Sequence, residues 1–113
     1  MPRGGPYSQA VVYNGIAYLS GLVGVSKGEQ KTFMEQWETI IGRADKILRN
    51  LGSELKDHTL KLTAYLSSNE YFPELNNAFQ STFGEGAPAR TTVVCAFTLP
   101  EVLVELDITA CAE

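Results

Sequence analysis

Two stretches near the end of the chain decide the fold: Pro88-Ala89-Arg90-Thr91-Thr92-Val93 and Leu103-Val104-Glu105-Leu106-Asp107-Ile108-Thr109-Ala110. Side chains alternate between the two faces of a β-strand. In the second stretch this alternation places only apolar residues on one face and both carboxylates, Glu105 and Asp107, on the other. The pattern predicts strands over 91–96 and 103–110, with one face of the second strand in a core and the other face acidic.

Arg90 stands directly before the first of these strands. Its guanidinium group has a planar fork of donors that matches a carboxylate or a phosphate. We expect the two strands to pair antiparallel through a turn at 97–100, which would bring Arg90 near the far end of the acidic face. The alternative is an exposed ion pair at a strand edge, which would contribute about 0–1 kcal/mol. Spacing alone leaves both interpretations open.

Upstream, the chain begins with a predicted β-hairpin. The β-branched and aromatic runs at 7–13 and 16–22 are separated by Asn14-Gly15, which is a strong short-range hairpin signal. Ser20-Gly21 lies within the second run. A glycine beside a strand either allows a close backbone approach to a ligand or marks a bulge, and the sequence favours neither.

Two helices and one further strand follow. Apolar residues at helical spacing predict a helix over 33–51 that ends before Gly52, with Trp37 on its core face. Alternation over 60–66 predicts a strand with its apolar residues, Leu60, Leu62, Ala64 and Leu66, together on one face. A second helix is predicted from Tyr71, with Pro73 in its first turn, where proline is tolerated. Its inward face is expected to carry the apolar residues Phe72, Leu75, Phe79 and Phe83.

The element order is therefore β-β-α-β-α-β-β, which predicts one α+β domain spanning 1–113, with a single sheet covered on one face by two helices. The opposite sheet face would carry Lys61, Tyr65, Glu105, Asp107 and several threonines. Such a mixed face is unusual both for a core and for a solvent surface. We expect a homo-oligomer in which these sheet faces pack together.

Composition excludes several classes of function. The 113 residues carry a net charge of −4 and the pI is near 5.0, which disfavours nucleic acid as a partner. No apolar stretch is long enough to span a membrane, and the N-terminus lacks a signal pattern, so we expect a cytoplasmic protein.

Cys95 and Cys111 are predicted to be buried free thiols, and His58 is the single histidine. We expect no metal site.

Several separated motifs together resemble the reactive-intermediate deaminase family, also called Rid or YjgF, across nearly the whole chain. In order along the chain, the motifs are Gly5-Pro6-Tyr7-Ser8-Gln9-Ala10, Ser20-Gly21, Phe72-Pro73-Glu74-Leu75-Asn76, Pro88-Ala89-Arg90-Thr91-Thr92-Val93 and Val104-Glu105-Leu106-Asp107. The resemblance implies a chorismate-mutase-like α+β fold and a homotrimer with pockets between neighbouring subunits.

The resemblance also implies an activity, the cofactor-free hydrolysis of 2-aminoacrylate and its 2-iminopropanoate tautomer to a 2-keto acid and ammonia. Arg90 matches the arginine that binds the substrate carboxylate, and Glu105 matches the acid that positions or activates water. The other positions that match the family's pocket are Tyr7, Ser20, Gly21 and Asn76. Thr92 stands where the best-known deaminases have a cysteine, but it still offers a hydroxyl and a backbone N–H.

Three alternatives remain at this point. The chain could act on another small carboxylated substrate, such as an aminomuconate or a catabolic aminoacrylate. It could be a non-catalytic trimer that binds keto acids or docks on another enzyme. A ribonuclease role, also attributed to the family, is disfavoured by the acidic pI. If Glu105 exchanges protons near neutral pH, burial and Asp107 should raise its pKa while Arg90 should lower it.

Overall fold

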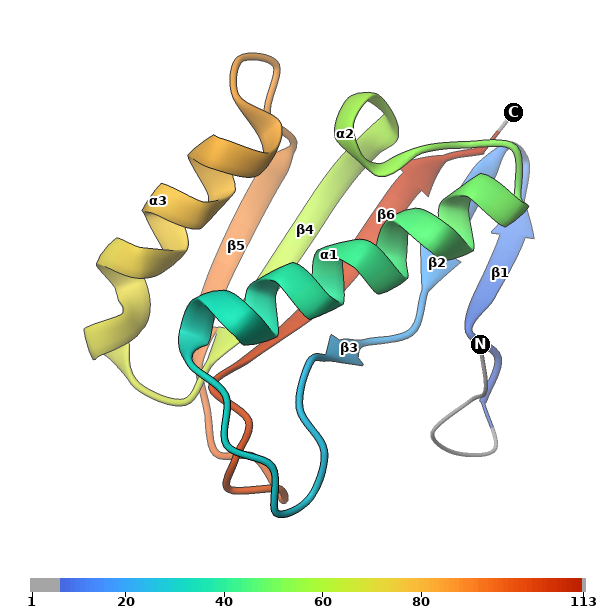
Figure 1. Ribbon diagram of the computed structural model, residues 1–113. Coiled ribbons are helices and arrows are strands. Elements are labelled where there is room, and N and C mark those ends of the chain that lie inside the picture. Colours follow the sequence, from blue (N-terminus) through green and yellow to red (C-terminus); the bar gives the residue numbers. More distant parts are fainter. Residues whose placement is uncertain (1–6, 113) are drawn as a thin grey trace.

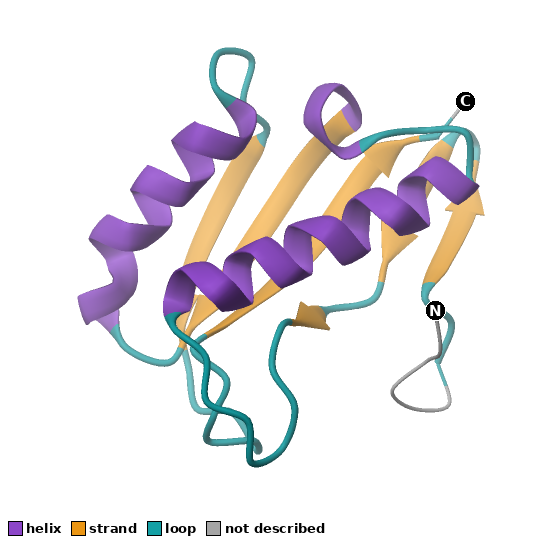
Figure 2. Ribbon diagram, in the orientation of Figure 1, coloured by secondary structure: helices purple, strands orange, loops and turns teal. Residues whose placement is uncertain are grey.

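Residues 7–112 are described by a computed structural model, in which one mixed sheet is covered on one face by helices (Figures 1 and 2). The strands follow the order β1-β2-β6-β4-β5, and β3 pairs with β6. Their bounds are β1 Ala10–Tyr13, β2 Ile16–Leu19, β3 Leu22–Val23, β4 Thr59–Leu66, β5 Ala89–Val94 and β6 Val104–Cys111. The long helices are α1 (Phe33–Asn50) and α3 (Phe72–Phe83). The predicted α+β layer is confirmed.

Two short helical turns were not predicted: α2 (Leu55–His58) before β4 and the 3₁₀ turn η1 (Asn69–Tyr71) before α3. Neither is long enough to show helical periodicity in the sequence. Among residues 7–112, no helix is both long and apolar enough to cross a membrane. Met1 to Pro6, which include the Gly5-Pro6 part of the first motif, lie outside the described residues.

The first hairpin forms as predicted around Asn14-Gly15, both of which have positive φ (51° and 77°). The second strand ends earlier than expected. Tyr18 pairs with Thr109 and Leu22 pairs with Leu106, so the register along β6 shifts by one residue between β2 and β3. The chain thus bulges at Leu19–Gly21, and the bulge bends the strand toward the open face of the sheet, which is the face that the helices do not cover.

Helix α1 is closed at both ends by local hydrogen bonds. Thr32 caps the N-terminus in a reciprocal pair with Glu35. Beyond the C-terminus, Gly52 adopts φ of 77° and donates to Arg49, while Ser53 donates to the Leu48 carbonyl. This is a Schellman motif, and it confirms Gly52 as the residue that ends the helix.

The core lies between the helices and one face of the sheet. Trp37 is buried there, as predicted, and its Nε1 donates to Thr82 Oγ1 at 3.0 Å, which links α1 to α3. The sheet contributes the buried residues of β4 and β6 that were predicted to face inward, namely Leu62, Ala64, Leu66, Val104, Leu106, Ile108 and Ala110.

The predicted antiparallel pairing of the last two strands is wrong. β4 lies between β5 and β6; it pairs with β5 in parallel and with β6 antiparallel. The reason is the crossover through α3, because a strand, helix and strand in succession favour parallel neighbours. The connection from Val94 to Val104 then passes the end of β4 instead of forming a tight turn.

The predicted burial also fails for four side chains. Leu60 is 48% exposed because a bulge between Thr59 and Lys61 interrupts the alternation of β4. Phe72 is 43% exposed, because the first turn of α3 lies beyond the core. Cys95 and Cys111 are free but only partly buried, and Cys95 lies just after β5.

Candidate functional site

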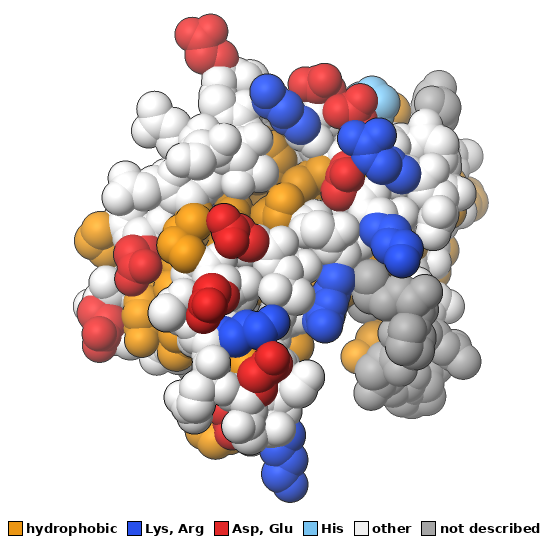
Figure 3. Space-filling view, viewed as in Figure 1, with side chains coloured by type: hydrophobic (Ala, Val, Ile, Leu, Met, Phe, Trp, Pro, Cys, Tyr) orange, Lys and Arg blue, Asp and Glu red, His pale blue; other side chains and the backbone are white. Residues whose placement is uncertain are grey.

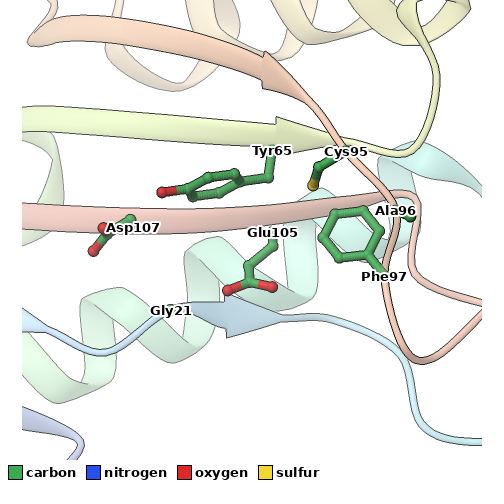
Figure 4. Close-up of a pocket in the computed structure, with 7 residues that line it drawn as sticks. All are labelled: Gly21, Tyr65, Cys95, Ala96, Phe97, Glu105 and Asp107. Atoms are coloured by element: carbon green, nitrogen blue, oxygen red, sulfur yellow. The ribbon is translucent and has the colours of Figure 1, made fainter.

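Glu105 lies on the open face of the sheet, opposite the helices. It pairs with Tyr65 of β4 and Val23 of β3, and it alternates with the buried Val104 and Leu106. In Figure 4 the side chains of Tyr65, Glu105 and Asp107 lie in front of the sheet, with α1 behind it. The predicted acidic face is therefore present, and it is not covered by any element of residues 7–112.

The bulge brings Gly21 directly against the Glu105 carboxylate. A Cβ at position 21 would collide with Glu105 Oε2 and would lie 3.2 Å from Cδ. Only glycine leaves room for the carboxylate in this position. Both interpretations of Ser20-Gly21 thus hold, since the segment is a bulge and also a point of close approach.

The pKa of Glu105 is raised. Burial is the larger cause, because a partly buried carboxylate loses hydration, and the negative charge of Asp107 adds to it. Arg90 does not counteract these effects. Among residues 7–112, no group donates a hydrogen bond to the Glu105 carboxylate, so nothing there stabilises its ionised form.

Two hollows meet at Glu105. The larger, of about 460 Å³, is lined by Tyr7, Leu19, Ser20, Gly21, Glu105 and Asp107. The smaller, of about 290 Å³, is lined by Gly21, Tyr65, Cys95, Ala96, Phe97, Glu105 and Asp107, as Figure 4 shows. Four predicted pocket residues, Tyr7, Ser20, Gly21 and Glu105, thus come together, and we call them the acidic half-site.

Ser20 anchors this half-site to the chain before β1. Its hydroxyl donates to the Ser8 carbonyl at 2.6 Å, and its backbone N–H donates to the Gln9 carbonyl at 3.0 Å. The hydroxyl proton is therefore engaged within the chain, while the oxygen lone pairs can still accept a hydrogen bond. The two bonds hold Tyr7 at the rim of the larger hollow.

The remaining predicted residues, Asn76, Arg90 and Thr92, form a second group that we call the arginine half-site. Arg90 Nη2 donates to Asn76 Oδ1 at 2.7 Å. Thr92 lies two residues along β5 on the same face and is partly buried. Burial lowers the pKa of the Arg90 guanidinium, but an arginine stays charged at any physiological pH.

The two half-sites lie on opposite faces of the sheet. Arg90 pairs with the buried Leu62 and contacts α3, so it points to the helix-covered face, whereas Glu105 points to the open face. The strand β4 separates them, and Arg90 is three positions from Glu105 along the sheet. The Cα atoms of Arg90 and Glu105 are therefore about 10 Å apart across the strands and about 10 Å apart along them. Within one chain, Arg90 and Glu105 cannot contact one small substrate together.

Other potentially reactive residues do not form a site in the described chain. His58 Nδ1 lies 3.0 Å from Ser53 Oγ, but that hydroxyl donates to the Cys111 carbonyl at 2.5 Å. Residues 7–112 contain no cluster of three acidic, histidine or cysteine side chains that could hold a metal. On the helix-covered face, Figure 3 shows Lys and Arg interspersed with Asp and Glu, so this face has no basic stripe for nucleic acid.

Comparison with known proteins identifies the family. A model of the family described as Endoribonuclease L-PSP matches residues 2–112. This chain belongs to that family. The L-PSP family includes the RutC and Rid proteins among the relatives found, so the Rid/YjgF family predicted from the motifs is confirmed.

Three L-PSP family relatives show how far the similarity extends. The RutC family protein of Aquifex aeolicus is 34% identical over 94% of this chain and 88% of its own length. A Neisseria meningitidis member of the YjgF protein family superposes with a TM-score of 0.84 at 33% identity, covering 95% of this chain and 87% of that one. Reactive Intermediate Deaminase A of Arabidopsis thaliana chloroplasts is 29% identical over 94% of this chain and 58% of its own length.

Sequence reasoning missed some residues around both half-sites. Phe72 and Phe79 place their rings beside Arg90. Phe79 also packs against the core, as predicted, whereas Phe72 does not. Their spacing from Asn76, four residues before and three after, was a usable signal, because it places all three on one side of a helix. Cys95 and Phe97 line the smaller hollow, and no sequence pattern indicates this because they lie in an irregular connection.

Proposed function

We propose that this protein hydrolyses reactive 2-enamine and 2-imine acids, of the 2-aminoacrylate and 2-iminopropanoate type, to 2-keto acids and ammonia. The observation that carries the proposal is the presence, in one chain, of the Glu105 carboxyl with its raised pKa and of the Arg90 guanidinium with donors left for an anion. The chain also belongs to a family that includes a reactive intermediate deaminase. The proposed reaction needs no metal or cofactor.

The chemistry requires two kinds of group. A 2-imino acid has one carboxylate, which Arg90 would bind through paired N–H donors. Its imine carbon must be attacked by water, and Glu105 would take a proton from that water and return one to the departing nitrogen. A carboxyl with a raised pKa is suited to both steps, because its pKa lies closer to the neutral pH at which it must accept and release a proton.

We also propose that the working site forms between two copies of the chain. The acidic half-site of one subunit would face the arginine half-site of its neighbour, since the two lie on opposite faces of one sheet. The open face supports this assembly because it carries exposed apolar residues, Val11, Tyr13, Tyr18 and Val93, beside polar ones. A closed ring in which every interface is the same, such as a trimer, would complete every site.

Two alternatives use other features of the chain. Hydrolysis of a different small carboxylated substrate would keep Arg90 and Glu105 and would differ in the fit to the smaller hollow, where Tyr65, Cys95 and Phe97 form a largely apolar wall. Cleavage of RNA is the activity that the family description names. The net charge of −4 and the mixed charges of the helix-covered face disfavour it.

The test is release of ammonia and pyruvate from 2-aminoacrylate generated in the assay by a lyase. The wild type should exceed the spontaneous rate by about 10²-fold or more, and Arg90→Ala and Glu105→Ala should each approach that spontaneous rate. A wild-type oligomer no faster than buffer would reject this substrate class. Parallel incubation with RNA, before and after ion-exchange purification, separates an intrinsic nuclease from a contaminant.

A further inference from the structure

The guanidinium group of Arg90 lies between two phenylalanine rings of α3. Arg90 Cζ is 5.0 Å from the centre of the Phe79 ring and 5.7 Å from the centre of the Phe72 ring. Both distances fall within the range of about 6 Å at which the negative face of a ring attracts a cation. With the hydrogen bond to Asn76 at 2.7 Å, three side chains hold this one group.

All three contacts come from one side of α3. Residues 72, 76 and 79 are spaced so that they lie one above the other on a helix. This side borders the fully buried one, which is formed by Leu75, Ala78 and Phe83, and the Phe79 ring also contacts the Phe83 ring at 5.0 Å between centroids. Phe72 is 43% exposed and is not part of the hydrophobic core, so core packing does not explain a phenylalanine at this position.

We propose that Phe72 and Phe79 are positioning residues that hold the Arg90 guanidinium, together with Asn76, in the orientation that receives a substrate carboxylate. The inference rests on the proposed function, in which Arg90 binds that carboxylate. It adds a role for two aromatic residues that would not touch the reacting atoms.

The contacts leave the guanidinium able to bind a ligand. An arginine has five N–H donors. The faces of the two aromatic rings stabilise its positive charge without occupying all of these donors. Among residues 7–112, Asn76 is the one hydrogen-bond acceptor for this group, so most of the fork stays available for a carboxylate. Holding the fork before the ligand arrives reduces the conformational freedom lost on binding, which improves affinity.

The experiment compares leucine and tyrosine at position 72. Phe72→Leu keeps an apolar side chain but removes the ring face, whereas Phe72→Tyr keeps the ring. In the oligomeric protein, we expect Phe72→Leu to raise the KM for the imine and the Kd for pyruvate, measured by calorimetry, about 3- to 10-fold, with kcat changed less than about twofold. Phe72→Tyr should restore wild-type values. Phe79→Leu should act in the same direction.

A second readout follows Arg90 itself, without a ligand. Nuclear magnetic resonance relaxation of the Arg90 Nε–H group, assigned by its loss in Arg90→Ala, should report greater mobility in Phe72→Leu and wild-type mobility in Phe72→Tyr. The matched control is Tyr71→Leu. Tyr71 stacks on Phe33 at 5.6 Å and makes no contact with Arg90, so this change should lower the melting temperature and leave Arg90 mobility and pyruvate affinity unaltered.

The outcomes separate this inference from the function on which it rests. If Phe72→Leu and Phe79→Leu leave Arg90 mobility and pyruvate affinity unchanged while Arg90→Ala abolishes binding, the rings do not position the guanidinium and the carboxylate role of Arg90 stands. If Arg90→Ala binds pyruvate as tightly as the wild type, both the proposed function and the inference fall.

Discussion

At the scale of single residues, the closest constraint is the contact between Gly21 and the Glu105 carboxylate. Alanine at position 21 would collide with Glu105 Oε2. Because that oxygen ends a flexible side chain, the chain should still fold with the carboxylate displaced. We expect Gly21→Ala to lower kcat/KM at least about 10-fold in the imine assay, since a displacement of about 1 Å in a catalytic group is costly.

The control for Gly21→Ala is another glycine-to-alanine change. Gly42 lies in the middle of α1 with open space where a Cβ would stand. Gly42→Ala should stabilise the protein by about 0.5–1 kcal/mol, because alanine favours the helix, and should leave the rate unchanged. Equal rates for Gly21→Ala and the wild type would show that the carboxylate position is not critical.

The raised pKa of Glu105 predicts the pH dependence of the rate. If Glu105 acts as a base, kcat/KM must rise with pH as the carboxyl ionises, and the midpoint should lie above the ordinary carboxyl value of 4.5. Asp107→Asn removes the smaller of the two causes, so the midpoint should move to lower pH without reaching the ordinary value. A profile that Asp107→Asn does not move would contradict the contribution of Asp107 to the raised pKa of Glu105.

The raised pKa of Glu105 also affects the stability of the fold, which it should lower as the pH rises, whereas the rate should increase. A carboxyl whose pKa is higher in the folded state than in the unfolded chain stabilises the fold at low pH, and this contribution is lost as pH rises through the folded pKa. Glu105→Gln cannot titrate. We therefore expect the melting temperature of Glu105→Gln, relative to wild type, to increase between about pH 4 and pH 7. A constant difference across that range would contradict the shift.

At the scale of elements, Gln36 ties helix α1 to the segment that leads into β6. This fully buried side chain donates to the Lys31 and Glu101 carbonyls at 3.1 and 2.9 Å, and its Oε1 accepts from the Leu103 N–H at 2.9 Å. Because Glu105 lies on β6, these hydrogen bonds also fix the position of β6 and of the Glu105 carboxylate relative to helix α1. Sequence periodicity does not reveal this role, because a polar residue on the buried side of a helix looks like an interruption.

We expect Gln36→Met to lower the free energy of unfolding by about 2–4 kcal/mol, because methionine fills the space but leaves buried backbone groups without partners. Urea unfolding monitored by Trp37 fluorescence measures the change. The matched control is Gln80→Met on the exposed side of α3, which should stay within about 0.5 kcal/mol of wild type. Similar stabilities for the two variants would show that the buried hydrogen bonds are replaceable.

At the scale of the whole molecule, the central finding is that the two half-sites lie on opposite faces of one sheet. If each working site takes Arg90 from one subunit and Glu105 from the next, two inactive variants should complement each other. Arg90→Ala and Glu105→Ala subunits mixed in equal amounts, unfolded and refolded together, should recover about a quarter of wild-type activity, since each partner of a site is intact with probability one half.

Each variant refolded alone is the control and should stay inactive. Light scattering on the mixture verifies that oligomers form, and differently tagged subunits show that they contain both variants. Mixed oligomers without recovered activity would exclude a site shared between neighbouring subunits. A monomeric wild type would exclude it as well.

Local patterns in the sequence were enough to predict the two long helices, most of the strands and the core-facing residues of β4 and β6. Asn14-Gly15, Gly52 and Pro73 act through local backbone geometry, and the alternation from Val104 to Ala110 reflects the two sides of a strand, so each can be recognised without knowing the fold. The motif residues of both half-sites were also recognisable, because their residue types and order along the chain resemble the motifs of the Rid/YjgF family.

The way in which those elements combine depends on contacts between segments far apart in the chain, which no local pattern specifies. The place of β4 between β5 and β6 depends on the crossover through α3, and it puts Arg90 and Glu105 on opposite sides of the sheet. The rings around Arg90 and the contact of Gly21 with Glu105 join residues far apart in the chain. Local patterns specify on which side of a helix or strand a residue lies. The order of the strands and the packing of the helices specify which other residues that side contacts, because strand order and helix packing follow from burying the whole apolar surface at once.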